Sequence, residues 1–304
     1  MYHKALEYLL DNDPEKVLSK SGMFIRKITN FIVRKIMAPL SAKNKLHIER
    51  RADIPKDRPV IYAPTHAFSD DIASALNATG RHCYMLVGAL NIVFTTFRGI
   101  ALWMNGIILV NRNKKDSRSA AVDKMKKLLN MGGNLIMYPE ATWNKSKNLL
   151  VLKLFPGIYD VATATGALVV PVSSIEENGV VHVIVDDAFD ISEYSREEGM
   201  LVLRDKMATA KYELMDKYSH MKRSDIGDEK TYWKNYIDKL IEDSNGLYIK
   251  KEEDKAGFID KKITTYKQAF AHLKTLIPSK ANAFLFDKRR GGMKFGKFQS
   301  KIQK

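Results

Sequence analysis

The sequence contains very little cysteine and has no long uninterrupted apolar run. Its single cysteine, Cys83, excludes an intrachain disulfide, and no spacing of cysteine and histidine suggests a zinc site. Cys83 lies in an apolar run that continues to Val87, which favours a buried, inert thiol over a nucleophile. These features indicate a reducing compartment and argue against thiol chemistry and against a metal site.

Neither a signal peptide nor a membrane span is expected. The first residues have no apolar core of the length that a signal peptide needs. The most apolar region, residues 83–110, is long enough for a spanning helix of about 20 residues. However, it contains Arg98 near its middle and three glycines, Gly88, Gly99 and Gly106. We therefore expect buried helices and a strand in this region rather than a membrane span.

Acidic residues are scarce relative to basic ones. The chain has 50 Lys and Arg against 35 Asp and Glu, a net charge of +15. Such an excess attracts polyanions, either nucleic acid or the anionic face of a bilayer. The cations concentrate in residues 20–50 and 280–304, each with eight basic residues and a single acidic one. With 304 residues, 45% of them hydrophobic, the composition predicts one α/β domain with additions.

Residues 23–37 have the pattern of an amphipathic helix. At helical spacing the bulky apolar residues gather on one side, namely Phe24, Ile25, Ile28, Phe31, Ile32 and Ile36. Polar residues gather opposite them, namely Arg26, Lys27, Asn30 and Arg34. A helix of this kind suits the bilayer interface, and the alternative is a surface helix packed on the rest of the protein. Further cations at Lys43 and Lys45 favour the membrane interpretation.

Short apolar runs alternate with helical segments in the middle of the chain. The pattern predicts strands at residues 59–63, 107–110, 135–138, 168–170 and 180–185, and helices at residues 70–77 and 117–131. Strands separated by helices imply βαβ units. We therefore expect an α/β fold with a single sheet of mostly parallel strands flanked by helices.

After Ser195 the pattern turns helical. The sequence predicts a long helix between Met200 and Tyr218, followed by helices at residues 232–241 and 266–277. The resulting division is an amphipathic N-terminal membrane-surface segment, an α/β domain and a helical, basic C-terminal extension, at residues 1–50, 51–195 and 196–304.

Three histidines have an aspartate five positions later: His66 with Asp71, His182 with Asp187, and His220 with Asp225. Only His66 directly follows an expected strand, in the loop that opens a helix, where open α/β sheets place their ligand sites. There a carboxylate that accepts from one ring nitrogen fixes the tautomer, so that the other nitrogen can take a proton. Ser69 or Asp70 can cap this helix, and this pair alone favours a histidine in a capping loop with no catalytic role.

Polar residues follow other expected strands in the same way. Arg112 follows one strand, Glu140 and Thr142 follow the next, and Pro171 closes a fourth. In order, the sequence shows four blocks: His66…Asp71, Gly106…Arg112, Pro139-Glu140-x-Thr142 and Val170-Pro171. These blocks resemble those of the glycerolipid acyltransferase family, which includes the 1-acylglycerol-3-phosphate acyltransferases, over residues 55–190.

The resemblance implies a reaction and the residues that carry it. His66 would be the general base on the acceptor hydroxyl, with Asp71 as its orienting partner. Arg112 would bind the phosphate or another anionic head group of the acceptor as a bidentate fork. Glu140 would position either the acceptor or the site backbone, and two further residues would shape the pocket, namely Gly106 and Thr142.

The resemblance also implies the partners. The donor would be an acyl thioester of coenzyme A or acyl carrier protein, and the acceptor a lyso-lipid. Transfer would be direct, with no covalent acyl-enzyme, no metal and no cofactor, and the sequence has no nucleophile-elbow serine. Together with the amphipathic helix, this predicts a peripheral protein on the anionic, cytoplasmic face of the membrane.

The third block departs from the family pattern. The family usually has glycine after the glutamate and arginine after the threonine, where this chain has Ala141 and Trp143. The acceptor therefore stays open between 1-acylglycerol-3-phosphate and another lyso-lipid such as a lyso-aminolipid, and Lys145 or Lys147 are alternative cations. The rival of a different class is a non-catalytic basic protein that binds membranes or nucleic acid. Nucleic acid is not expected, because the basic residues accompany apolar faces and no binding motif is present.

Overall fold

The computed structural model describes residues 2–145, 149–220, 224 and 227–243. The helix expected at residues 266–277 and the basic segment at residues 280–304 lie outside the described residues.

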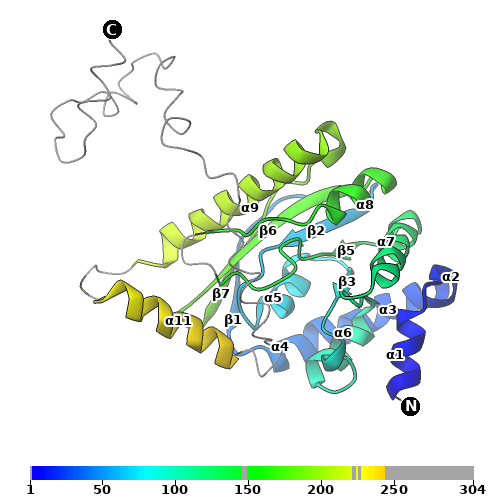
Figure 1. Cartoon of the computed structure of the whole chain (residues 1–304), viewed down its shortest axis with the longest axis horizontal. Helices are drawn as coiled ribbons and strands as arrows, with labels where there is room; N and C mark the ends of the chain where they lie inside the picture. Colours follow the sequence, from blue (N-terminus) through cyan, green and yellow to red (C-terminus); the bar gives the residue numbers. More distant parts are fainter. Residues whose placement is uncertain (1, 146–148, 221–223, 225–226, 244–304) are drawn as a thin grey trace, which may run out of the picture. The chain divides into compact units, whose positions relative to one another are not determined.

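The centre of the fold is a seven-stranded sheet with strand order β1-β7-β6-β2-β5-β3-β4 (Figure 1). Its strands are β1 (Lys45–Arg51), β2 (Val60–Pro64), β3 (Tyr84–Val87), β4 (Ile107–Leu109), β5 (Leu135–Ile136), β6 (Leu168–Glu177) and β7 (Val180–Val185). The strands from β6 to β4 run parallel, whereas β7 is antiparallel to β6 and β1 is parallel to β7. The predicted α/β class and the mostly parallel single sheet are confirmed.

Helices cover both faces of the sheet, and alternate strand residues supply both cores. In β2, Ile61 and Ala63 pack with α7 (Lys115–Asn130), α8 (Gly157–Thr165) and α9 (Arg196–Tyr218). On the other face, Val60 and Tyr62 pack with α1 (Tyr2–Leu10), α5 (Asp71–Ala78) and α6 (Phe97–Asn105). A strand buried on both faces reads as a continuous apolar run, which is why the central strands could be recognised in the sequence.

The fourth expected strand was placed too short. Instead of ending at Pro171, β6 continues to Glu177 and forms a hairpin with β7. Asn178 and Gly179 turn the chain, both with positive φ (51° and 76°), as a tight two-residue hairpin requires. Pro171 still lies opposite Ala63 at the end of β2, so the block stays beside the site.

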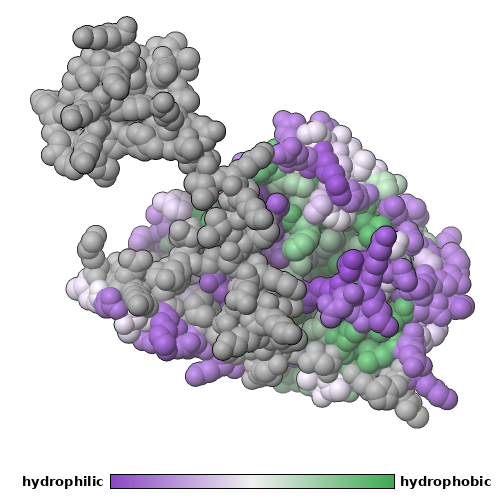
Figure 2. All heavy atoms as spheres, in the orientation of Figure 1, coloured by the Kyte–Doolittle hydropathy of each residue, from purple (hydrophilic) through white to green (hydrophobic). Residues whose placement is uncertain are grey.

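The α/β unit extends past both of the expected domain limits. Strand β1 crosses residue 50, and α9 packs its buried face, which includes Leu203 and Met207, on the sheet core. Helix α11 (Glu229–Asp243) follows, in agreement with the helix expected at residues 232–241. Hydrophobic and hydrophilic residues both reach the surface on the face shown in Figure 2, in spite of the large net charge.

Residues 83–110 form β3, the 3-10 helix η2 (Leu90–Ile92), α6 and β4, as expected from their glycines and Arg98. Among the described residues, no helix combines the length and the apolar character needed to cross a membrane. Cys83 is buried, and burial raises the pKa of its thiol to about 12, which agrees with an inert thiol.

The amphipathic helix packs on the protein with its polar side. It consists of α3 (Lys20–Ile32), the π-helix η1 (Val33–Met37) and α4 (Ala38–Ser41). Asn30 is buried and donates to Asn105 Oδ1 at 2.7 Å, Thr29 donates to the carbonyl of Met104 at 2.7 Å, and Arg26 lies over the Trp103 ring. The apolar side therefore faces outward.

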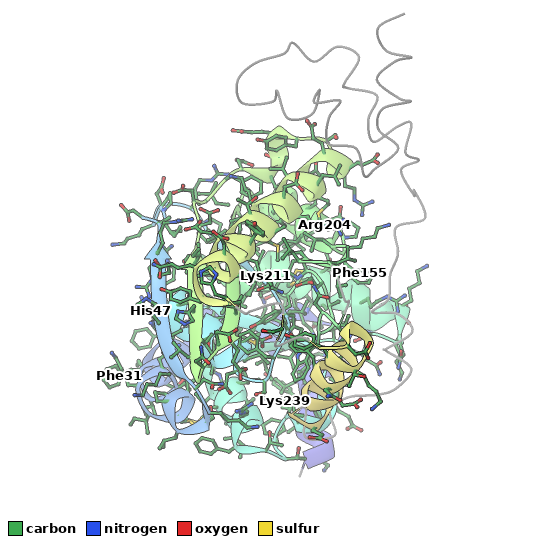
Figure 3. All side chains as sticks on the ribbon, turned by 90° about the vertical axis from the view of Figure 1, so that its left-hand side faces the viewer. Phe31, His47, Phe155, Arg204, Lys211 and Lys239 are labelled. Atoms are coloured by element: carbon green, nitrogen blue, oxygen red, sulfur yellow. The ribbon has the colours of Figure 1, made fainter. Side chains whose placement is uncertain are left out.

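We call this outward side the apolar surface. It comprises seven exposed residues, namely Phe24, Ile25, Ile28, Phe31, Ile32, Ile36 and Leu40. On α6, the helix against which α3 packs, Phe97 and Ile100 are also exposed. Figure 3 shows Phe31 at the edge of the molecule. The helix is thus packed on the rest of the protein, as the alternative interpretation expected, but it packs through its polar side.

Candidate active site

Residues that follow parallel strands meet at one edge of the sheet. His66 follows β2, Arg112 follows β4 and Glu140 follows β5, and these three strands run in the same direction. The carboxyl edge of such a sheet is where α/β proteins bind their ligands. The sequence blocks therefore converge on a single site.

His66 and Asp71 form a hydrogen-bonded pair. Nδ1 of His66 lies 2.8 Å from Oδ2 of Asp71, and the same oxygen accepts from the backbone N–H groups of Ala67 (2.9 Å) and Phe68 (3.2 Å). The Asp71 side chain is 1% exposed and that of His66 is 18% exposed. The carboxylate accepts the Nδ1 proton, so Nε2 carries the lone pair of the neutral ring.

Two aromatic rings flank the imidazole. The Tyr138 ring lies 4.4 Å from the His66 ring, centroid to centroid, and the Trp143 ring stands edge-on to it at 6.0 Å and 84°. Burial, followed by the charge of Asp71, raises the pKa of Tyr138 well above its usual value, so its hydroxyl stays protonated. These rings fix the plane of the imidazole and shield it from solvent.

Glu140 holds the backbone on both sides of the site. Its side-chain oxygens accept from the N–H of His66 at 3.0 Å and from the N–H of Leu152 at 2.8 Å. The residue is 1% exposed, and burial raises the pKa of its carboxyl. The N–H of Asn144 also donates to the carbonyl of His66 at 2.7 Å. This geometry favours the second of the two expected roles for Glu140, positioning of the site backbone.

Replacing Glu140 with alanine should destabilise the fold. The substitution removes the acceptor of two backbone amides, one buried and one partly buried, and we expect the free energy of unfolding to fall by about 3 kcal/mol. Denaturant unfolding of the full chain measures this loss. Glu193→Ala, at an exposed glutamate, serves as the control and should change stability by less than about 0.5 kcal/mol. Equal stability of the two variants would contradict the backbone role of Glu140.

Arg112 is exposed, but its side chain is directed by its neighbours. Its Nη1 donates to the carbonyl of Ala141 at 2.5 Å, within the third block. A Cβ atom at Gly88 would lie 2.4 Å from Nε of Arg112, so glycine there allows the guanidinium to cross the end of β3. Ala141 has φ +57°, which explains why a glycine suits this position in the family. Thr142 is partly buried in the same loop.

Gly106 is the one predicted site residue that lies elsewhere. It precedes β4, at the opposite end of that strand from Arg112. Its φ is +108°, and an added Cβ would lie 2.8 Å from the Tyr84 ring. Glycine is therefore needed there for the close approach of Tyr84, and the structure does not bring Gly106 to the other site residues.

Helix α9 contributes residues that the sequence did not indicate. Arg204 donates to the carbonyl of Val151 through Nε (3.2 Å) and Nη2 (3.0 Å), which holds the segment that Glu140 also binds. Lys211, on the same helix (Figure 3), interacts electrostatically with Glu140 and Asp71, and burial lowers its pKa. Arg204 and Lys211 are seven residues apart, which places them on the same side of the helix. Because they lie far along the chain from the four blocks, the sequence did not connect them with the site.

The His182/Asp187 pair is not a second site of the same kind. The His182 ring stacks on Tyr218, with the ring centroids 3.6 Å apart, and its Nδ1 has no hydrogen-bond partner in the described part of the chain. Asp225, the partner expected for His220, lies outside the described residues. Among the described pairs, the structure thus brings together the histidine and aspartate that the strand argument favoured.

Comparison with known proteins identifies the class of this fold and site. Residues 45–175 match the Acyltransferase family. The 1-acyl-sn-glycerol-3-phosphate acyltransferase of Salmonella typhimurium is 27% identical over 176 residues, which cover 53% of this chain and 69% of the relative. The protein of the same name from Borreliella burgdorferi is 25% identical over 179 residues, covering 54% and 70%.

A solved structure has the same fold. The 1-acyl-sn-glycerophosphate (LPA) acyltransferase PlsC from Thermotoga maritima superposes with a TM-score of 0.51 at 19% identity, over 73% of this chain and 90% of that one. These similarities confirm the resemblance that the sequence blocks indicated. The segment of residues 45–175 carries this family match, and the chain is an O-acyltransferase.

Proposed function

We propose that this enzyme moves a fatty acyl group from a thioester donor to a hydroxyl of a lyso-lipid acceptor such as 1-acylglycerol-3-phosphate, with His66 as general base. The observation that carries the proposal is the His66–Asp71 hydrogen bond of 2.8 Å at the edge of the sheet where Arg112 and Glu140 also lie. The imidazole is partly exposed, and the buried Asp71 carboxylate binds its Nδ1. Its Nε2 is therefore suited to take a proton from a hydroxyl.

The proposed reaction proceeds by direct transfer. Nε2 of His66 takes the proton of the acceptor hydroxyl while the hydroxyl oxygen attacks the thioester carbonyl. Asp71 stabilises the imidazolium that forms. The tetrahedral intermediate then expels the donor thiolate, and the imidazolium returns the proton to that sulfur. The products are the acylated lipid and the free thiol of the carrier, coenzyme A or acyl carrier protein, and no cofactor is consumed.

Two kinds of acceptor fit the residues around His66. The curated relatives are named for 1-acyl-sn-glycerol-3-phosphate, and the Arg112 guanidinium could bind its phosphate as a fork. Trp143, however, stands edge-on to His66 where the family usually has arginine. This aromatic side chain supports a second candidate, a lyso-lipid with a less anionic head group, such as a lyso-aminolipid.

A direct assay tests the proposed reaction. The purified full chain is incubated with acyl-CoA or acyl-acyl carrier protein, each with 1-acylglycerol-3-phosphate, a lyso-aminolipid or no acceptor, and the acylated lipids are measured by mass spectrometry. We expect acceptor-dependent product with at least one donor. Folded protein that acylates neither lyso-lipid with either donor would overturn the proposal.

Arg112→Lys should impair use of an anionic acceptor. A lysine ammonium cannot reproduce the planar fork, and loss of one charge-assisted hydrogen bond corresponds to about a tenfold lower kcat/KM for the acceptor. The KM for the donor should change little. Arg196→Lys is the control, because Arg196 is exposed and pairs with Asp160 away from the blocks. A variant impaired for the donor instead would assign Arg112 to the carrier side of the site.

We also propose that the apolar surface binds the cytoplasmic face of the membrane, so that the enzyme acts as a peripheral protein. Seven exposed bulky side chains on α3, η1 and α4 form a patch that water solvates poorly. The segment that contains this surface, residues 20–50, is strongly basic, which suits an anionic leaflet. An acceptor with an acyl chain resides in such a leaflet, so surface binding would bring enzyme and substrate together.

A further inference from the structure

A second buried carboxylate lies directly beside Asp71. Asp70 is completely buried and stands at the N-cap of α5, but its side chain does not cap the helix. Its oxygens face other parts of the chain instead.

The Asp70 carboxylate gathers donors from residues 43–44 and from α6. Oδ2 accepts from the backbone N–H of Lys43 at 2.7 Å, from the backbone N–H of Asn44 at 2.9 Å and from Asn44 Nδ2 at 3.0 Å. Oδ1 accepts from Nη2 of Arg98 at 3.0 Å. A buried carboxylate with this set of donors is held in one place.

Arg98 extends the same network. Its Nη2 also donates to the carbonyl of Ser41, at the end of α4, and its Nη1 donates to the carbonyl of Ser69 at 3.1 Å. The guanidinium thereby joins the end of the amphipathic helix, the start of α6 and the loop between His66 and Asp71. Each of these contacts is made to backbone or to a buried carboxylate, so the loop has little freedom to shift.

We infer that Asp70 and Arg98 are positioning residues for the His66–Asp71 pair, an inference that rests on the proposed role of His66. Asp70 and Asp71 are consecutive, and one carboxylate binds residues 43–44 and Arg98 while the next binds His66. A displacement of Asp70 or Ser69 therefore displaces Asp71 and the imidazole that it orients. Neither Asp70 nor Arg98 touches the reacting atoms; both act through the loop.

The expected effect is on kcat rather than on substrate binding. A misplacement of about 1 Å in a catalytic group can lower the rate on the order of a hundredfold. We therefore expect Arg98→Met to lower kcat by about tenfold to a hundredfold, with the KM values for donor and acceptor within about twofold of the wild type. Arg98→Lys, which keeps a cation beside Asp70, should recover part of the loss.

Arg58 provides a matched control. It binds a carboxylate, Asp190 Oδ2 at 2.6 Å, and a backbone carbonyl, that of Gly166, just as Arg98 does. The two arginine side chains are equally exposed, 38% for Arg58 and 37% for Arg98. Arg58 precedes β2, at the end of the sheet away from His66. Arg58→Met should lower stability without lowering the kcat of the folded enzyme.

The experiment measures kcat and both KM values on the folded full chain for Arg98→Met, Arg98→Lys, Arg58→Met and His66→Ala. If Arg98→Met does not fold, Asp70→Asn and its control Asp190→Asn replace the methionine pair. A kcat loss specific to the Arg98 or Asp70 variant supports the inference, and equal kcat in the test and control variants overturns it. An active His66→Ala variant would overturn the proposed role of His66 as general base. An inactive His66→Ala variant beside a fully active Arg98→Met variant would overturn only the positioning role of Arg98.

Discussion

His66→Ala is expected to lower kcat by about 10² to 10⁴-fold, because a general base typically contributes that much to the rate. The alanine has no nitrogen to accept the proton of the acceptor hydroxyl, and water is a far weaker base. The fold should tolerate the change, since the histidine side chain is partly exposed and Asp71 keeps its bonds from the N–H groups of Ala67 and Phe68. Acyl transfer by the purified variant gives kcat, and thermal unfolding shows that the protein is intact.

His182→Ala is the matched control for this prediction. His182 also has an aspartate five positions later, but its ring stacks on Tyr218 on the β7 side of the sheet. We expect the control to keep the wild-type kcat, with at most a loss of stability. An inactive His182 variant beside an active His66 variant would show that His182, and not His66, is the general base.

The parts of the fold and site that could be predicted from the sequence depend on local patterns. Central strands such as β2 are apolar throughout because both faces are buried, and residues after parallel strands must meet at one edge. These two rules were sufficient to bring His66, Arg112 and Glu140 together. Gly106 was assigned to the site only by the resemblance to the family, and because it precedes β4 it lies at the opposite end of that strand from Arg112.

Other features depend on contacts between distant segments and have no local signal. The position of Asp70 in the sequence is typical of a helix cap, but in the structure its carboxylate binds Lys43, Asn44 and Arg98. Lys211 reaches the site only because α9 packs across the sheet more than a hundred residues after His66. Such roles follow from tertiary packing, which overrides the local propensity of a residue.

The amphipathic helix has features that could be predicted from the sequence and one that could not. Its helical period and its two faces were predictable, but the direction in which each face points was not. The polar side is buried because Asn30 and Thr29 find partners on α6, an arrangement that hydrophobicity alone would not suggest. The consequence is that the bulky apolar side chains are exposed, and this exposure leads to the second large expected effect.

Changing Phe24, Ile28 and Phe31 together to serine should abolish salt-resistant binding to membranes. These side chains are 65%, 57% and 66% exposed, so they are available for burial in a bilayer. Burying each one contributes roughly 1.5 kcal/mol or more, and together they correspond to an affinity loss of at least about a thousandfold. Salt screens the attraction of basic residues to anionic lipid but does not weaken apolar burial. Wild-type binding should thus weaken but persist at high salt.

Co-sedimentation with anionic vesicles at low and high salt measures both contributions. The triple variant should keep only a salt-sensitive remnant, carried in part by the basic residues of segment 280–304. Its activity should fall on acceptor presented in vesicles and survive on a short-chain soluble acceptor. The control replaces three exposed apolar residues of α9, namely Leu201, Tyr212 and Met215, which are 53%, 60% and 38% exposed. If the α3 variant binds like this control at high salt, the apolar surface is not the membrane contact, because its loss would then remove no burial in the bilayer.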